Sequence, residues 1–496
     1  MSDSTPPPIP AAPPIHPVVA ALSDFSDRIS PVMVKELRQG MRTRDFTSIF
    51  LILQVILAFA MFLALVADSG NIGTSISQMV FLLFAIVALI LQPLRGTTAV
   101  ATELKDATFE IMSLTRLSSM RIVLGKWASL VSQTALMLAS IIPYLVMRYF
   151  FGGMQLFAEL ALLVTIFFLS ACLTAMTVGL SCNRAVIVRA LVPLFGVPFG
   201  LMGIMSLFIR SRGNNLIEVF TFQDPETNLV LGIFLLLSLY AGYYFLEMGV
   251  SRIARSAENH ATRKRLVSLI LMAITLGIFL SSDAIAGSIF VVLFFTCFIG
   301  LDVCTEDAVG VPRVVAPFVR KGPIGRLLGY ILYPGWHTGL VVLTGLFFLT
   351  IFVGEATYKR GWLGSNPGLT EELIFVIIGI FYTILTPLLI LRRFAARISN
   401  PFTTYIGILV LSGIFTILLM ILTSVSRGDE AILLLFAWIP GVWMLIADNA
   451  SVGEVLFMWF LLAIVWVILD VLAAQEFRTT RSLEARVRDL LNNDAA

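Results

Sequence analysis

The dominant pattern of this chain is a series of long apolar runs separated by short polar segments. The hydrocarbon core of a bilayer is about 30 Å thick and requires roughly 20 apolar residues of helix. The first run of that kind is Thr47–Ala67. The other five in the first half are Ile76–Leu94, Trp127–Met147, Leu160–Leu180, Ala190–Ile209 and Leu229–Val250. Because polar or basic residues bound each run, we predict six membrane-spanning helices here.

Six more apolar runs predict a second set of spans. They are Leu266–Leu280, Ala284–Leu301, His337–Gly354, Leu373–Leu391, Tyr405–Val425 and Val455–Ala473. The first two are short, and only Ser281, Ser282 and Asp283 separate them, which predicts a tight helical hairpin. The pattern as a whole predicts an all-α integral membrane protein with about twelve transmembrane helices.

A further apolar run, Ala431–Ala447, is long enough to raise the question of a thirteenth span. Pro440 and Gly441 lie at its middle, where they would interrupt a membrane helix. With twelve spans and a cytosolic N-terminus, 28 of the 34 Lys and Arg residues lie on the cytosolic side. A thirteenth crossing would move the four C-terminal arginines outside. We therefore predict a re-entrant or interfacial hairpin on the outer side, with both termini cytosolic in a cytoplasmic (inner) membrane.

The segments fall into four regions. We predict that residues 1–29 form a disordered, proline-rich cytosolic tail. Residues 30–265 and 266–474 are expected to form two six-span domains, and residues 475–496 a cytosolic C-terminal helix. Each six-span set reads as a two-span hairpin, a basic loop and four further spans. Glu103 after the second span parallels Glu306 after the eighth. Short matches of this kind also arise by chance, so the sequence leaves a degenerate repeat undecided.

Composition narrows the possible functions. Apolar residues make up 58% of the chain and charged residues 13%, which leaves too little polar surface for soluble domains of this length. The net charge of +3 gives no reason to expect a nucleic-acid partner. The four cysteines lack CxxC spacing and the three histidines are widely spread without acidic companions, so we expect no metal site and no catalytic site.

Two polar segments lie next to the predicted spans of the first half: one lies before the first span and the other lies between the second and third spans. Before the first span, Ser30 and Pro31 predict the start of a helix whose apolar face would lie in the cytosolic membrane interface, in contact with lipid. Its centre is Lys35, Glu36, Leu37 and Arg38. The alternative is a basic flank of the first span with no further role.

The loop between the second and third spans is the longest cytosolic loop of the first half. Phe109 and Met112 are spaced to share one face of a short helix, while Glu103 and Glu110 stay polar. Such a helix would either dock on a soluble partner or simply pack on the membrane surface.

This loop resembles the signature of type-2 ATP-binding-cassette (ABC) exporter permeases. That family shows a glutamate, then Gly-Thr-Leu-Glu, a leucine-rich turn with Thr-Pro, and Ile-x-x-Gly-Lys before the third span. The matching residues here are Glu103, Thr108, Phe109, Glu110, Leu114, Thr115, Ile122, Gly125 and Lys126, with Met112 and Arg121 between them. Ala107 and Arg116 depart from the family's glycine and proline. The segment around Lys35–Arg38 also resembles the helix before the family's first span.

The resemblance implies a permease subunit whose coupling loop docks on a separate cytosolic ABC ATPase. The chain has no G-x-x-x-x-G-K-[ST] loop, so it is expected to bind no ATP itself, and ATP would act through the partner. The two halves would form a single-chain pseudo-dimer, or two chains a homodimer. The alternative is a twelve-span secondary transporter driven by an ion gradient, against which the scarcity of mid-membrane charge argues. The substrate is not predicted.

Overall fold

The chain folds into a bundle of helices. The computed structural model describes residues 31–66, 72–105, 118–150, 155–210, 220–254, 258–281, 287–308, 310–359, 371–394, 398, 400–426, 436–446 and 451–493. Within these ranges there are helices and turns but no strand, and ten helices are long and apolar enough to cross a membrane. These findings confirm the predicted all-α membrane fold. The tail 1–29 and the loop residues Thr108, Phe109, Glu110 and Met112 lie outside the described ranges.

In the first half, a helix matches each of the six predicted spans. They are α3 (Arg44–Val66), α4 (Ile72–Ile86) with η1 (Val87–Leu91), α5 (Gln92–Gly96) and α6 (Ala101–Lys105), α8 (Ser119–Tyr149), α9 (Leu156–Ser181), α10 (Val186–Leu191) with η2 (Val192–Gly196) and α11 (Val197–Arg210), and α13 (Pro225–Ile253). The predicted interfacial helix is α2 (Pro31–Met41). Two of these spans contain a π-helical segment, η1 and η2.

The second half follows the same correspondence. The helices at its six predicted runs are α14 (His260–Ser281), α15 (Gly287–Val303), α18 (Trp336–Lys359), α19 (Glu371–Arg393), α20 (Pro401–Ser426) and α22 (Val452–Asn493), and the short helices α16 (Pro312–Val319) and α17 (Gly322–Leu332) lie between α15 and α18. Neither α15 nor the segment α10–α11 is among the ten described helices that are long and apolar enough to cross a membrane. The predicted last span and C-terminal helix are one continuous helix, α22.

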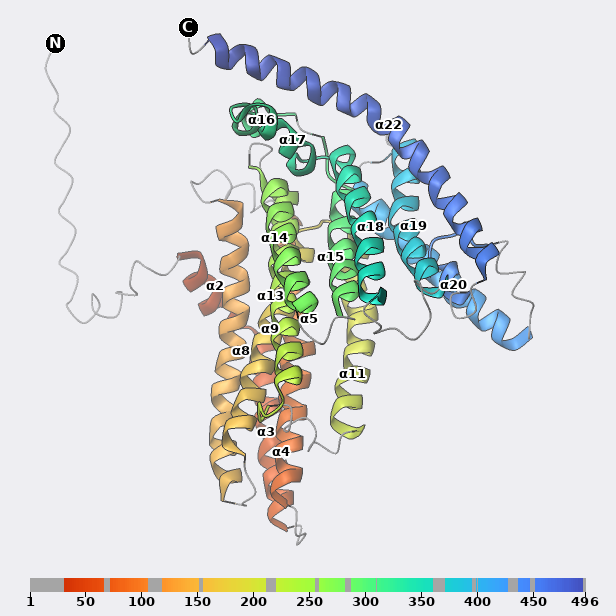
Figure 1. Cartoon of the computed structure of the whole chain (residues 1–496). Helices are drawn as coiled ribbons and strands as arrows, with labels where there is room; N and C mark the ends of the chain where they lie inside the picture. The colour runs from red at the N-terminus through yellow and green to blue at the C-terminus, as the bar shows by residue number, and fades with distance from the viewer. Residues whose placement is uncertain are drawn as a thin grey trace, which may run out of the picture.

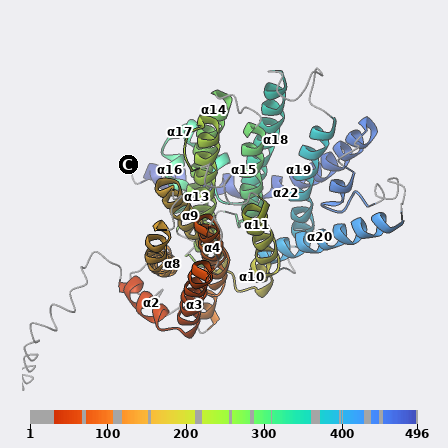
Figure 2. The ribbon, with the colours of Figure 1, turned by 90° about the horizontal axis from the view of Figure 1, so that it is seen from below.

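Seen along the bundle, α2, α3 and α8 lie on one side and α18, α19 and α20 on the other, with α13 and α15 between them, while α22 runs across the bundle from the side of α19 to that of α16 (Figure 2). In the side view, α22 runs past α19 and continues to the level of α16 (Figure 1). Val315 on α16 and Val487 on α22 belong to one buried cluster, so the C-terminal part of α22 is packed on α16.

Helix α13 is the central element that positions the charged residues described below. Asp224 caps its first turn, because its carboxylate accepts a hydrogen bond from the backbone amide of Thr227 at 3.1 Å. Pro225 occupies the first helical position. Further along, Gly249 meets Gly179 of α9 so closely that a Cβ on either residue would clash with the facing backbone. Small residues permit such direct backbone contact between membrane helices.

Several helices begin earlier than the apolar runs predict. Helix α8 begins at Ser119 rather than Trp127, which places Arg121, Gly125 and Lys126 in its first two turns rather than in a loop. Helix α14 begins at His260 rather than Leu266. The predictions were wrong at these ends because hydropathy locates only the apolar part of a helix, while backbone hydrogen bonds continue through polar residues.

The run Ala431–Ala447 forms no spanning helix in its described part, residues 436–446. These residues form turns and the 3-10 helix η4 (Val442–Leu445). Gly441 has φ of 94°, a left-handed conformation that interrupts a helix. Trp443 is buried and donates its indole N–H to the Thr383 hydroxyl on α19 at 2.8 Å. The segment therefore folds back on the bundle; the side of the membrane on which it lies remains a prediction.

Candidate functional site

One lysine brings together three of the predicted site segments. The Lys126 Nζ atom on α8 lies 3.3 Å from a Glu36 carboxylate oxygen on α2 and 2.7 Å from Glu103 Oε1 on α6. The Lys126 side chain is only 7% exposed, and the two glutamates are mostly buried. We call these three residues the Lys126 bridge. Because α6 ends and α8 begins at the two edges of the loop 106–117, the bridge fixes both ends of that loop to α2.

A second set of contacts holds α2 against α8. A side chain at Gly40 of α2 would clash with the Gln133 side chain of α8, so the two helices are in close contact. The Gln133 side-chain oxygen accepts a hydrogen bond from Arg95 of α5 at 2.6 Å, and Arg95 also donates to Gln92 at 2.8 Å. The predicted interfacial helix is thus anchored to protein.

The remaining predicted residues do not join the Lys126 bridge. Lys35 and Arg38 are exposed on α2 and Leu37 is half-buried. Arg121 is exposed, whereas Gly125 is buried in the first turns of α8. Three basic side chains, Lys35, Arg38 and Arg121, are thus exposed on α2 and α8.

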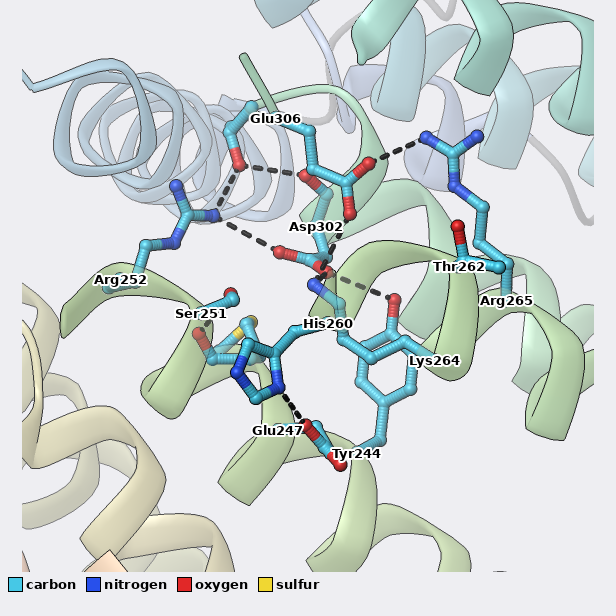
Figure 3. Close-up of polar contacts among 12 residues, drawn as sticks. Tyr244, Glu247, Ser251, Arg252, His260, Thr262, Lys264, Arg265, Asp302 and Glu306 are labelled. Carbon is cyan, nitrogen blue, oxygen red and sulfur yellow. Dashed lines mark hydrogen bonds and ion pairs between the residues drawn. The ribbon is translucent and has the colours of Figure 1, made fainter. Parts of the chain in front are cut away.

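The sequence interpretation missed a buried group of charges at the ends of α13, α14 and α15, shown in Figure 3. We define this ion-pair cluster as Glu247, Arg252, His260, Arg263, Lys264, Arg265, Asp302 and Glu306. At its centre, the fully buried Asp302 pairs with Lys264 and, at 3.1 Å, with Arg252. Glu306 pairs with Arg265 at 2.6 Å and with Lys264 at 3.2 Å.

Glu247 forms the other end of the ion-pair cluster. Its carboxylate lies 2.7 Å from His260 Nδ1 and 3.1 Å from Arg263 Nε. The second ring nitrogen of His260 lies 3.1 Å from Glu258. The expectation that the histidines lack acidic companions was therefore wrong for His260. The error arose because its main partner, Glu247, lies 13 residues earlier on another helix.

Arg265 extends the cluster to the turn before α18. Its guanidinium donates to the carbonyl oxygens of Ile331 at 3.0 Å and Gly335 at 2.9 Å and to the Thr338 hydroxyl at 2.9 Å. Burying a charge is costly unless it is paired and hydrogen-bonded, and Arg265 meets both conditions through its two terminal nitrogens. It thereby connects α14, α15 and α18.

The charges in the cluster largely compensate one another. Burial alone would raise the pKa of the Glu306 carboxyl, but the charges of Arg265 and Lys264 and the hydrogen bonds from Arg265 and the Gly335 amide lower that pKa to about 2. A carboxyl with a lowered pKa contributes stability above its usual pKa and loses it only as the pH falls toward 2. Glu306 therefore stays ionised near neutral pH and is unsuited to releasing and binding protons there.

A sequence signal for part of the cluster does exist. Asp302 and Glu306 are four residues apart, a spacing that brings side chains to one side of a helical turn. The run Arg263–Arg265 supplies their cations, but hydropathy assigns such a run to a loop. Within the described ranges no three His, Cys, Asp or Glu residues are placed to hold a metal ion.

Comparisons with known proteins do not extend this picture. No protein-family model, no curated protein and no solved structure matches the chain.

Proposed function

We propose that this chain is the membrane permease of an ATP-driven ABC exporter and works with a separate cytosolic ATPase. The observation that carries the proposal is the Lys126 bridge. It joins the three segments in which the sequence resembles the exporter family: the helix α2, the glutamate before the loop, and the Gly-Lys pair before the third span. Charged groups tied together with little exposure provide a firm attachment for a loop that receives force.

The geometry suggests how movement of the loop would reach the membrane helices. On one side of the loop, α6 follows α4, η1 and α5 in the second span; on the other, α8 is a continuous helix of 31 residues. A displacement of the loop by a closing ATPase would therefore move α2, the second span and α8 together. Packed rigid elements are the usual carriers of such coupling.

The proposal is tested by replacing Phe109 and Met112 with aspartate in the chain co-expressed with a soluble ABC ATPase. The two aspartates would have to lose their water in the contact, which is expected to weaken the free energy of association by several kcal/mol, on the order of a hundredfold in binding. The measurement is co-purification, together with ATP hydrolysis by the lone chain and by the complex. The lone chain is expected to hydrolyse no ATP.

A matched control is the same double change at Ile324 and Leu327 of α17, two exposed apolar residues in the second-half loop. It is expected to leave association unchanged if the first-half loop is the docking element. Full partner binding by the Phe109/Met112 variant, or ATP turnover by the purified chain alone, would remove the basis of the proposal.

The ion-pair cluster favours a second candidate, a transporter driven by an ion gradient, because buried ionisable groups in membrane proteins often mark ion pathways. Glu247, Lys264, Arg265 and Asp302 are its most buried members. The compensated pairing described above argues for a structural role instead. Proteoliposomes containing a trapped pH-sensitive dye distinguish the two: the exporter permease is expected to leave an imposed proton gradient intact.

A further inference from the structure

An apolar cavity lies within the first half, away from the charged residues. Its volume is about 440 Å³, and it is lined by the second span, α9 and the segment α10–α11. Leu89 and Ile90 of η1, Leu173 and Met176 of α9, and Val192 and Ile204 across the segment α10–α11 are among its walls. This volume falls in the usual range for small-molecule sites.

The walls of the cavity offer hydrocarbon and almost nothing else. The lining side chains are aliphatic, together with glycine, proline, methionine and one threonine. That threonine, Thr177, already donates its hydroxyl hydrogen to the Thr174 carbonyl oxygen at 3.1 Å. Water would find few partners here, and an empty space of this size forfeits packing energy. An aliphatic occupant satisfies both conditions.

The shape of the cavity is long and follows the helix axes. On α9 its lining runs from Leu173 to Leu180, which is roughly 10 Å at the rise of an α-helix. On the opposite wall it runs from Leu191 to Ile204, roughly 20 Å by the same measure. A slot of this form matches an extended chain better than a compact ring.

Both π-helical segments of the described chain border this slot. In η1 the amide of Gln92 bonds to the Val87 carbonyl, five residues back, just before Pro93, which has no amide hydrogen to donate. In η2 the amide of Val197 likewise bonds to the Val192 carbonyl, just before Pro198. Such π segments are frequent at functional sites. Gly196 and Gly200 leave further space on this wall, where side chains would otherwise project.

We propose that this cavity binds one long aliphatic chain taken from the membrane, either the acyl chain of a phospholipid or a free fatty acid. Leu173 is 36% exposed and Gly196 is also exposed, so the cavity reaches the outer surface of the bundle. In a membrane protein that surface adjoins lipid tails. The inference does not depend on the proposed export function, because it rests on the walls, shape and surroundings of the cavity.

The test uses the full chain in lipid nanodiscs with two photoactivatable probes, a diazirine-bearing phosphatidylcholine and a diazirine-bearing palmitic acid. Mass spectrometry of the cross-linked peptides is expected to find saturable labelling in residues 173–180 and 191–204. The probe that competes at the lower concentration identifies the source of the chain. Labelling of these peptides that rises linearly with either probe, like that of exposed helix surfaces, overturns the proposal.

Filling the cavity provides the matched comparison. Gly200→Leu directs a side chain toward Ile90, from which a Cβ would be 3.7 Å away, whereas a Cβ at Gly203 of the same helix meets nothing within 4 Å. Gly200→Leu is expected to reduce saturable labelling at least fivefold and Gly203→Leu to leave it unchanged. Met176→Phe on α9 fills the slot from the opposite wall and is expected to act like Gly200→Leu. Equal labelling of wild type and both filling variants, each confirmed as folded by its melting curve, overturns the proposal.

Discussion

Individual charged residues behave differently here from what their place in the sequence suggests. Arg263, Lys264 and Arg265 read as a basic loop, yet Lys264 and Arg265 are 1% exposed. The carboxylate partners of Lys264 and Arg265 follow about 40 residues later in the sequence, so the local pattern does not show why these two cations are buried. Single-sequence patterns do not report which distant residues meet, and so the ion-pair cluster was not predicted. Lys126, Glu36 and Glu103 were all predicted as site residues, but the ion pairs that join them were not predicted.

The pairing of Asp302 leads to a prediction about stability. Asp302→Ala leaves Lys264 as a buried cation that has lost its fully buried partner, and breaking a buried pair in this way costs about 3–5 kcal/mol. We expect a clear fall in the melting temperature of the purified protein in detergent. Asp307→Ala is the control, because Asp307 is exposed and surface charges contribute about 0–1 kcal/mol.

A double variant separates charge from packing. Adding Lys264→Met to Asp302→Ala removes a buried cation that has lost Asp302 but keeps its 3.2 Å pair with Glu306, so part of the lost stability is expected to return. If the stability lost by the double variant equalled the sum of the losses measured for Asp302→Ala and Lys264→Met separately, the two residues would not be coupled.

At the scale of whole elements, the apolar runs located a helix at each predicted span within the described residues but not where these helices end, and ten of the helices are long and apolar enough to cross a membrane. Span length follows from bilayer thickness, which acts on each run separately, so a single sequence is sufficient. Helix ends depend on tertiary partners: α8 begins near Ser119, where Lys126 meets Glu36 and Glu103, and α14 begins at His260, beside Glu247. Contacts between helices were likewise beyond the pattern, as the pairing of α9 with α13 illustrates.

The contact between α9 and α13 carries the second stability prediction. Gly249→Leu would drive a side chain into the backbone of α9 at Gly179 and separate α9 from α13. Because α13 also carries Glu247, the change would displace one end of the ion-pair cluster. Overpacking costs about 1–3 kcal/mol, and more where a backbone must move. We expect low yield and a lowered melting temperature. Gly232→Leu on the same helix faces open space and should behave as wild type; similar losses in both variants would show that leucine, not the contact, is responsible.

At the scale of the molecule, the structure limits the internal parallel between the halves. Glu103 pairs forward in the sequence with Lys126 of the next span, whereas Glu306 pairs backward with Lys264 and Arg265 of the preceding hairpin. The second-half loop forms α16 and α17, with Val315 buried against the C-terminal part of α22. The two glutamates thus make different contacts, which limits the parallel between the halves.

The packing of α22 also links the location of the C-terminus to that of the second-half loop. With 42 residues, α22 is roughly 60 Å long, about twice the thickness of a bilayer core, so one end must project. The projecting end carries Arg478, Arg481, Arg486 and Arg488 and contacts α16. The C-terminus and the loop between α15 and α18 therefore lie on the same side of the membrane, and the excess of basic residues predicts that this side is the cytosol.

A single cysteine at Ser482, which is exposed on α22, tests this orientation in a chain whose four native cysteines are replaced by alanine. We expect a membrane-impermeant maleimide to label it in broken membranes but not in intact cells. A cysteine at Gln155, exposed between α8 and α9 and predicted to face outward, should label in both. Labelling of Ser482→Cys in intact cells would place the C-terminus outside. The number of crossings would then be odd if the N-terminus is cytosolic, and the assignment of residues 431–447 to a non-crossing segment would have to be abandoned.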